Sequence, residues 1–107
     1  ETDVWSHRQL LDVVSHTPVE TAALNGLQAA YGFVDAVRAI VPPSNKLYTW
    51  WSYRAQDWSA SDRGRRLDHV WLSPELAPAL VTAEVTRAAR GWDSPSDHVP
   101  VTVELTV

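Results

Sequence analysis

The sequence predicts a single α/β domain, because segments with helical periodicity alternate with segments that have the periodicity of strands. The clearest helix begins at Thr17-Pro18-Val19-Glu20, and the clearest strand runs from Val99 to Val107. In that run valine and leucine occupy one parity and threonine and glutamate the other, which is typical of a strand with one buried face. At 107 residues the chain is large enough for one domain with one core.

The composition is that of an ordinary globular protein, with 45% apolar and 21% charged residues. The chain has no cysteine, which excludes disulfides and thiolate metal sites, and we expect a cytoplasmic protein. No run approaches the roughly 20 apolar residues of a membrane helix. The net charge of −4 argues against a sequence-independent electrostatic DNA binder, but not against an enzyme whose carboxylates hold a divalent cation. Because the chain has no methionine, even at its first position, we expect it to be a processed or excised piece.

The first predicted helix follows from its capping residues. Thr17 can accept from the amide three residues on, Pro18 suits the first helical position, and Glu20 completes a capping box. Gly32 predicts the end of this helix. Its apolar residues share one stripe, formed by Val19, Ala23, Leu27, Ala30 and Tyr31.

Further elements follow along the chain. Residues 33–41 are expected to form a second short helix, which the two prolines at 42 and 43 would end. A polar loop is expected at residues 55–64, and Ser73 is expected to cap a short helix or turn. His7 and His16 are expected on the surface. Three segments have strand propensity, at residues 48–53, 66–72 and 79–87, the last with Val81, Ala83 and Val85 on one face.

The segment Tyr48-Thr49-Trp50-Trp51-Ser52-Tyr53 leaves two interpretations open. Trp50 and Trp51 would point to opposite faces of a strand. A surface tryptophan beside arginine suits the stacking of a nucleotide or sugar ring, whereas two tryptophans packed between layers would be structural. The bunched Arg54, Arg63, Arg65 and Arg66 are likewise either phosphate ligands or members of a solvated loop.

Two acidic positions and one histidine are candidates for chemistry. Asp68 shares a predicted strand face with Val70 and Leu72, where a charge needs a partner, and a carboxylate there could orient a histidine. Asp97 and His98 stand side by side at the entrance of the last strand, where a scaffold holds catalytic side chains well. An Asp-His pair alone is more often structural than catalytic.

Taken together, three stretches of the sequence resemble the C-terminal motifs of the exonuclease III family, the abasic-site endonucleases among the DNase I-like metal-dependent phosphodiesterases. The order and spacing of the stretches agree with that family, and the resemblance extends over nearly the whole chain. The three stretches are Tyr48-Thr49-Trp50-Trp51-Ser52-Tyr53-Arg54, Arg63-Gly64-Arg65-Arg66-Leu67-Asp68 and Pro95-Ser96-Asp97-His98-Val99-Pro100-Val101.

The resemblance implies a role for the acid and histidine positions. His98 would contact the scissile phosphate as an acid–base or electrostatic catalyst, and Asp68 would orient its imidazole. Asp97 would lie by a divalent cation, Mg²⁺ or Mn²⁺, which polarises the phosphate and stabilises the leaving oxygen.

The resemblance also implies contacts with DNA. Trp50 and Leu67 would line the pocket for an extrahelical abasic sugar, and Arg54 and Arg63 would contact backbone phosphates. Two positions depart from the family pattern. An acid, Asp62, replaces a frequent asparagine and would repel phosphate unless it turns away, and Arg65 stands where a pocket residue is commonly apolar or aromatic, so the pocket is expected to be altered.

The resemblance gives the fold in more detail as the C-terminal half of a four-layer α/β sandwich. This half would hold about one mixed, mostly antiparallel sheet with its flanking helices, as one segment over residues 1–107. Glu1-Thr2-Asp3-Val4-Trp5 resembles the stretch that follows the Asp-x-Asn motif of the missing N-terminal half, which supplies an asparagine, a metal-binding glutamate and a tyrosine. The isolated chain is therefore expected to be inactive.

Three hypotheses for function result. The first is part of a DNA repair nuclease that acts at abasic sites and at DNA 3′ ends; the second is a related phosphodiesterase with a phosphoinositide, sphingolipid or RNA substrate. The third is an inactive half-domain that pairs with its missing half or with its own copy, because leaving several hundred Å² of apolar surface exposed forgoes on the order of 10 kcal/mol. The third hypothesis predicts an oligomeric or marginally stable chain.

Overall fold

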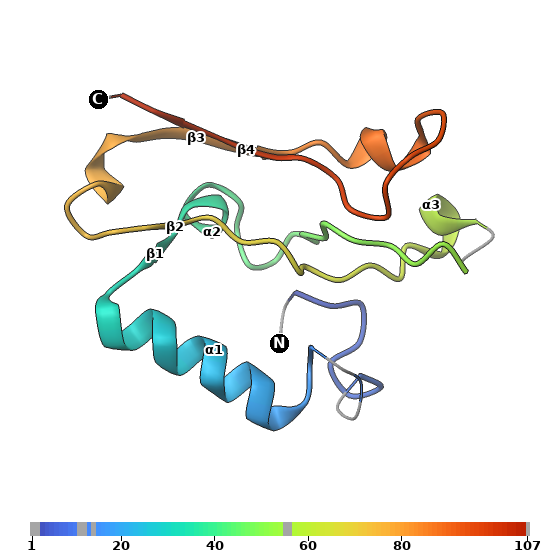
Figure 1. Ribbon diagram of the computed structural model, residues 1–107, viewed down its shortest axis with the longest axis horizontal. Coiled ribbons are helices and arrows are strands. Elements are labelled where there is room, and N and C mark those ends of the chain that lie inside the picture. The colour runs from blue at the N-terminus through green and yellow to red at the C-terminus, as the bar shows by residue number, and fades with distance from the viewer. Residues whose placement is uncertain (1–2, 11–12, 14, 55–56, 107) are drawn as a thin grey trace.

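The computed structural model describes residues 3–10, 13, 15–54 and 57–106. Glu1, Thr2, Ala55 and Val107, which belong to segments interpreted above, lie outside the described residues. Two antiparallel sheets of two strands each are present, β1 with β2 and β3 with β4. In Figure 1 the β3–β4 pair forms the upper layer, extended segments cross the middle, and the long helix α1 lies below them.

Helix α1, Pro18–Tyr31, confirms the predicted capping signals. The Thr17 side chain accepts from the Glu20 amide, and the Glu20 carboxylate accepts from the Thr17 backbone amide. The Thr17 hydroxyl also donates to the Glu20 carboxylate at 2.8 Å, and this hydrogen bond, followed by those from the Ser15 and Thr17 amides, lowers the pKa of Glu20. Gly32 ends the helix at φ 65°. No residue of α1 is buried, and Val19 is 80% exposed, so the apolar stripe is largely open to solvent, although the Tyr31 ring stacks on Phe33.

The predicted helix over residues 33–41 is partly wrong. Its first residues form β1, Val34–Asp35, which pairs with β2, Trp71–Leu72. Only Ala36–Ile40 forms the helix α2, which begins where the Asp35 side chain accepts from the Arg38 amide. The pairing with β2 outweighs the helical pattern of the first residues, because tertiary contacts override local propensity.

The predicted strands at residues 48–53 and 66–72 are also shorter than expected. Within them the structure has the two residues of β2 and isolated bridges that join Trp50 to Arg65 and to His98. Trp51 is 2% exposed and Trp50 is half-buried, in agreement with the expected opposite faces. The following polar segment contains one short helix, α3, Trp58–Ser61, where only a loop was expected.

The C-terminal half of the chain contains the longest strands. Strand β3, Leu80–Val85, pairs with β4, Val101–Leu105, and half-buried and exposed positions alternate along β4 as predicted. Val81, expected on the same face as Ala83 and Val85, is 50% exposed, whereas Ala83 is buried, and the register of the β3–β4 pair shifts between Leu80 and Thr82. The 3-10 turns η1 and η2, Ala77–Ala79 and Arg87–Gly91, flank β3.

Two small apolar clusters and one ionic cluster hold the elements together. The first apolar cluster joins the middle segment to η2 and to the start of the last strand, and the second places α2 against β3. In the ionic cluster the Arg66 guanidinium, 2% exposed, donates to both oxygens of Asp35 and lies 3.6 Å from Asp3. The buried members of the apolar clusters are Tyr48, Trp51, Ala89 and Val99 in the first, and Val37, Leu47 and Ala83 in the second.

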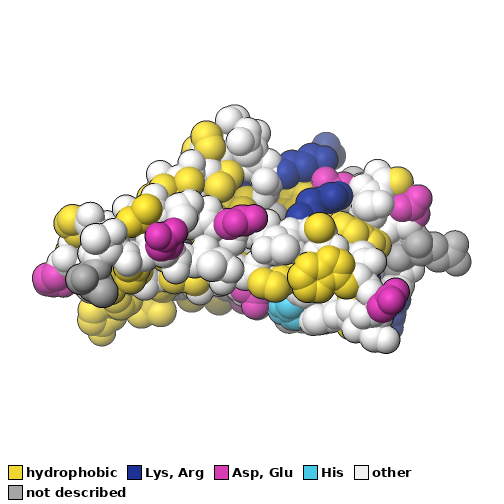
Figure 2. Space-filling view, turned by 90° about the horizontal axis from the view of Figure 1, so that it is seen from above, with side chains coloured by type: hydrophobic (Ala, Val, Ile, Leu, Met, Phe, Trp, Pro, Cys, Tyr) yellow, Lys and Arg dark blue, Asp and Glu magenta, His cyan; other side chains and the backbone are white. Residues whose placement is uncertain are grey.

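The surface keeps much apolar area. Figure 2 shows apolar side chains spread between acidic and basic ones over the face seen from above. Tyr31, Tyr53 and Trp92 are each more than 60% exposed, at 66%, 61% and 61%. None of the helices in the described part of the chain combines the length and the apolar character needed to span a membrane.

Candidate active site

A backbone frame brings the three sequence motifs together. The amides of Thr49 and Trp50 both donate to the Arg65 carbonyl, and the Arg65 amide donates back to Trp50. On the other side the Val99 amide donates to the Thr49 carbonyl, and the Trp51 amide donates to the Asp97 carbonyl. The segment at 49–51 is therefore the centre of the frame, with residue 65 on one side and residues 97–99 on the other.

His98 and Asp68 form a close pair in this frame. The distance from His98 Nδ1 to Asp68 Oδ2 is 2.6 Å, and the two side chains are 44% and 41% exposed. An ionised carboxylate only accepts hydrogen bonds, so Nδ1 carries the proton and Nε2 is left for a substrate. The residues expected to be catalyst and orienter thus lie at hydrogen-bond distance, although 30 positions separate them in the sequence.

Thr49 fixes the backbone that carries Asp68. Its hydroxyl oxygen accepts from the amides of Leu67 and Asp68, at 3.0 and 3.1 Å, and Thr49 is fully buried at 0% exposure. Sequence analysis missed this residue, because a threonine in a segment with strand propensity is unremarkable. The signal available in the sequence was the position of Thr49 between two aromatic residues, Tyr48 and Trp50.

The Asp97 carboxylate has a neutral donor as its partner. Trp50 Nε1 donates to Asp97 Oδ2 at 3.0 Å. In the part of the chain that the structure describes, no lysine, arginine or histidine pairs with Asp97. This half-buried carboxylate therefore keeps an unbalanced charge and free lone pairs, which suits one ligand of a hard divalent cation.

A complete metal site is not formed by these residues. Among the described residues there is no group of three or more histidine, aspartate or glutamate side chains able to hold a metal ion. Mg²⁺ is often held by only one or two carboxylates together with waters and substrate phosphates, so Asp97 fits as one of its ligands.

The residues expected in the abasic pocket lie in two different places. The Arg65 guanidinium lies over the Trp50 ring, 5.1 Å from its centre, and burial lowers the pKa of Arg65. Leu67 instead lines a cavity of about 210 Å³ beneath α1, and Trp50 is not among the described residues around it. The structure thus joins Trp50 with Arg65, which is not apolar, and not with Leu67.

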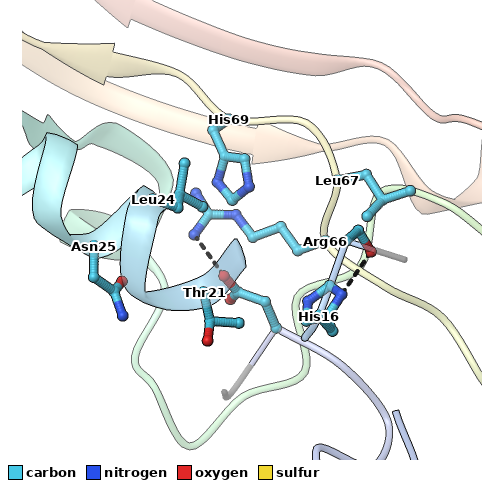
Figure 3. A pocket seen from close by; sticks show the side chains of 9 residues that line it. His16, Thr21, Leu24, Asn25, Arg66, Leu67 and His69 are labelled. Carbon is cyan, nitrogen blue, oxygen red and sulfur yellow. Dashed lines mark hydrogen bonds and ion pairs between the residues drawn. The ribbon is translucent and has the colours of Figure 1, made fainter. Parts of the chain in front are cut away.

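The cavity at Leu67 contains two histidines (Figure 3). His16, expected on the surface, is 6% exposed, and its Nδ1 lies 2.7 Å from the Ser15 hydroxyl. The expectation failed because the covering residues come from α1 and from residues 66–69. Burial, followed by the charge of an arginine, lowers the pKa of His16 and of His69.

The remaining arginines expected to contact phosphate are exposed. Arg54 is exposed, and the exposed Arg63 guanidinium lies 4.6 Å from the centre of the Trp5 ring.

Asp62, the acid that replaces a frequent asparagine, is engaged with other side chains. It accepts from Trp51 Nε1 at 3.1 Å and pairs with Lys46 and Arg87. Burial would raise the pKa of Asp62, but hydrogen bonds from Trp51 and Lys46 and the charge of Arg87 outweigh burial and lower it. Two cations thus balance this carboxylate, which lessens its repulsion of phosphate.

A hollow of about 380 Å³ lies beside His98, the histidine that contacts Asp68. His98 lines it together with Trp92 and Pro95. The Tyr53 hydroxyl donates to the Pro95 carbonyl at 2.7 Å and so ties the loop before His98 to the middle segment.

No protein-family model matches the chain. Individual relatives do match. The chain is 34% identical to exodeoxyribonuclease III of Haemophilus influenzae over 70% of its own length and 28% of that protein. It is 36% identical to the DNA repair nuclease APEX1 of Danio rerio over 85% of its length and 27% of that protein. The exodeoxyribonuclease of Bacillus subtilis is also 36% identical, over 71% of the chain and 28% of that protein.

Solved structures agree with these relatives. The 3′ phosphatase NExo from Neisseria, bound to a product DNA hairpin, superposes with a TM-score of 0.88 at 30% identity. The match covers 100% of this chain and 40% of that one. An AP endonuclease from Archaeoglobus fulgidus superposes with a TM-score of 0.85 at 31% identity, over 99% of this chain and 40% of that one.

These matches extend over most of the chain, whereas the chain spans only 27–28% of the length of the curated relatives. That coverage fits a C-terminal segment of such enzymes. In sequence and in its DNase I-like fold, the chain belongs to the exonuclease III family of AP endonucleases.

Proposed function

We propose that the chain supplies the histidine, its orienting acid and one metal ligand of a nuclease that hydrolyses DNA at abasic sites and at 3′ ends. The observation that carries the proposal is the His98–Asp68 pair at 2.6 Å, next to an Asp97 carboxylate without a basic partner among the described residues. Relatives named as DNA repair nucleases and exodeoxyribonucleases support DNA as the substrate class.

The His98–Asp68 pair could act as an acid–base or electrostatic catalyst at a phosphate. With Nδ1 bound to Asp68, the His98 ring is held in one tautomer and orientation, and Nε2 can bind a phosphate oxygen or exchange a proton with it. The exposure of both side chains leaves this atom within reach of a polymer substrate. Asp97 would hold a divalent cation, Mg²⁺ or Mn²⁺, which when bound polarises the phosphate and stabilises charge on the leaving oxygen.

The pocket proposed for the extrahelical sugar is altered in this chain. Trp50 offers a ring face, and Arg65 covers that ring with a cation. Leu67 remains a candidate for the pocket only if the substrate also reaches the cavity beneath α1. Arg54 and Arg63 are proposed as contacts with backbone phosphates, since both are exposed near the frame.

We infer that the chain alone has little activity. Asp97 is a single carboxylate, and the described residues contain no group of three or more side chains able to hold a metal ion around it. The remaining ligands would come from an N-terminal half of the kind found in the longer relatives. The exposed apolar stripe of α1 also favours a second function, self-association of the chain.

The test is the nicking of a duplex that carries one abasic site, with Mg²⁺. The chain is assayed alone and mixed with the N-terminal half of a family member. We expect nicking in the mixture only, abolished by His98→Ala and lowered roughly 100-fold or more by Asp68→Asn, which disturbs the tautomer. Glu104→Gln removes an exposed acid on β4 and serves as the control with unchanged rate.

Two outcomes would contradict the proposal. Nicking that survives in His98→Ala would remove the histidine from the mechanism. Cleavage by the chain alone that requires Mg²⁺ would show that the missing ligands are dispensable. A substrate series with RNA and phosphoinositide in place of DNA separates the related phosphodiesterase activities.

A further inference from the structure

The indole of Trp50 contacts two charged residues of the site, Arg65 and Asp97. Its N–H donates to Asp97 Oδ2 at 3.0 Å, while its ring faces the Arg65 guanidinium. Backbone bridges to Arg65 and to His98 hold Trp50 on both sides. The Trp51 amide donates to the Asp97 carbonyl at 3.0 Å, so the backbone of Asp97 is fixed beside the same segment.

A purely structural role would be the simplest explanation, because a partly buried indole N–H needs an acceptor. The neighbouring residue shows what such a role looks like. Trp51 is buried and donates to Asp62, whose charge is already balanced by Lys46 and Arg87. Asp97 differs, because the described part of the chain offers it no cation and its indole donor is neutral.

The geometry of the Asp97 contact leaves the carboxylate available. A neutral hydrogen bond to Oδ2 restricts rotation of the carboxylate without cancelling its charge, and Oδ1 stays free to bind a cation. Hydrogen-bond donors that contact a metal-ligating side chain fix the orientation of that ligand, and their loss commonly lowers metal affinity 10–100-fold.

We propose that Trp50 is a positioning residue for the divalent cation, acting through its N–H on Asp97. This inference rests on the proposed function in one respect, namely that Asp97 binds the cation. The same side chain offers its ring to the substrate and its N–H to the metal ligand. A nucleotide or sugar that shifts the Trp50 ring therefore also shifts the Asp97 carboxylate.

The experiment uses the ¹⁵N-labelled chain and Mn²⁺, whose paramagnetism broadens the amide signals near its site even when binding is weak. We expect selective broadening at residues 97 and 98 in the unmodified chain. Trp50→Phe keeps an aromatic ring over which Arg65 can lie but has no N–H to donate to Asp97, so the apparent Kd for Mn²⁺ should rise about tenfold. The control Trp71→Phe makes the same replacement in β2, outside the frame, and its Kd should equal that of the unmodified chain.

A second measurement does not depend on how the variants fold. Titration of the unmodified chain with diamagnetic Mg²⁺ should move the Trp50 indole ¹H–¹⁵N signal and leave the Trp51 indole signal in place. An unchanged Kd in Trp50→Phe, or equal movement of both indole signals, would overturn the positioning role while leaving the proposed function intact.

The outcomes separate this inference from the proposed function. Broadening that is absent from residues 97 and 98 would overturn both the positioning role and the metal assignment of Asp97. Nicking that persists in His98→Ala would overturn the proposed function alone, since the Mn²⁺ measurements do not involve the His98 side chain.

Discussion

Thr49 is the residue whose replacement tests the frame of the site most directly. Thr49→Val keeps the shape of the side chain but removes the hydroxyl oxygen that accepts from the amides of Leu67 and Asp68. Since Thr49 is 0% exposed, water cannot easily replace that oxygen. A buried donor left without an acceptor costs about 1–3 kcal/mol. For two donors with partial relaxation we expect the free energy of unfolding to fall by about 2–4 kcal/mol.

The assay for Thr49→Val is urea unfolding followed by tryptophan fluorescence. Thr102→Val on β4 is the matched control, because the same hydroxyl is removed at an exposed position, and it should change the free energy of unfolding by less than about 0.5 kcal/mol. Thr49→Ser keeps the hydroxyl and should retain most of the stability. A loss below about 0.5 kcal/mol in Thr49→Val, or a serine variant as unstable as the valine variant, would refute the reasoning.

Three further predictions concern packing, pH and association. A Cβ at Gly64 would lie 2.6 Å from Tyr48 side-chain atoms, so Gly64→Ala should destabilise the chain by about 1–3 kcal/mol in the same assay, and an unchanged midpoint would contradict the contact. Burial and nearby arginine charge lower the pKa of His16 and His69 below 6.5. The unfolded state therefore binds more protons, so stability should fall as pH drops below about 6.5 and be regained above it; a flat urea midpoint between about pH 5 and 7.5 would refute this. Light scattering should show a mass that rises with concentration, because the α1 stripe is exposed, whereas a monomer with a cooperative high-temperature melt would exclude self-association.

The elements that the sequence predicted well are those whose signals lie within a few residues. The α1 boundaries follow from Thr17, Glu20 and Gly32, all of which act on neighbouring backbone groups. The alternation of β4 was likewise readable, because one face of the strand is covered. The early part of the segment at 33–41 was mispredicted because its partner, β2, is more than thirty residues away in the sequence.

The site was predicted in its residue types but not in its connections. Asp68 was noticed as a charge on an apolar face, and only the resemblance named His98 as its partner; the structure places the two side chains at 2.6 Å. The hydrogen bond of Trp50 to Asp97 joins positions 47 residues apart, which no local pattern reveals. Leu67 was assigned to the pocket with Trp50, but Leu67 lines the cavity beneath α1, and Trp50 is not among the described residues around that cavity.

The long sequence separations in the frame have a consequence for folding kinetics. Contacts of the site and of the ionic cluster join residues 30, 47 and 31 positions apart, in the pairs His98–Asp68, Trp50–Asp97 and Arg66–Asp35. Closing such loops is slow compared with forming α1, because non-local contacts are made only after the entropy of loop closure has been lost. Helix α1 should therefore form early, whereas the His98–Asp68 pair should appear only with the global fold, so that no partly folded chain carries the assembled pair.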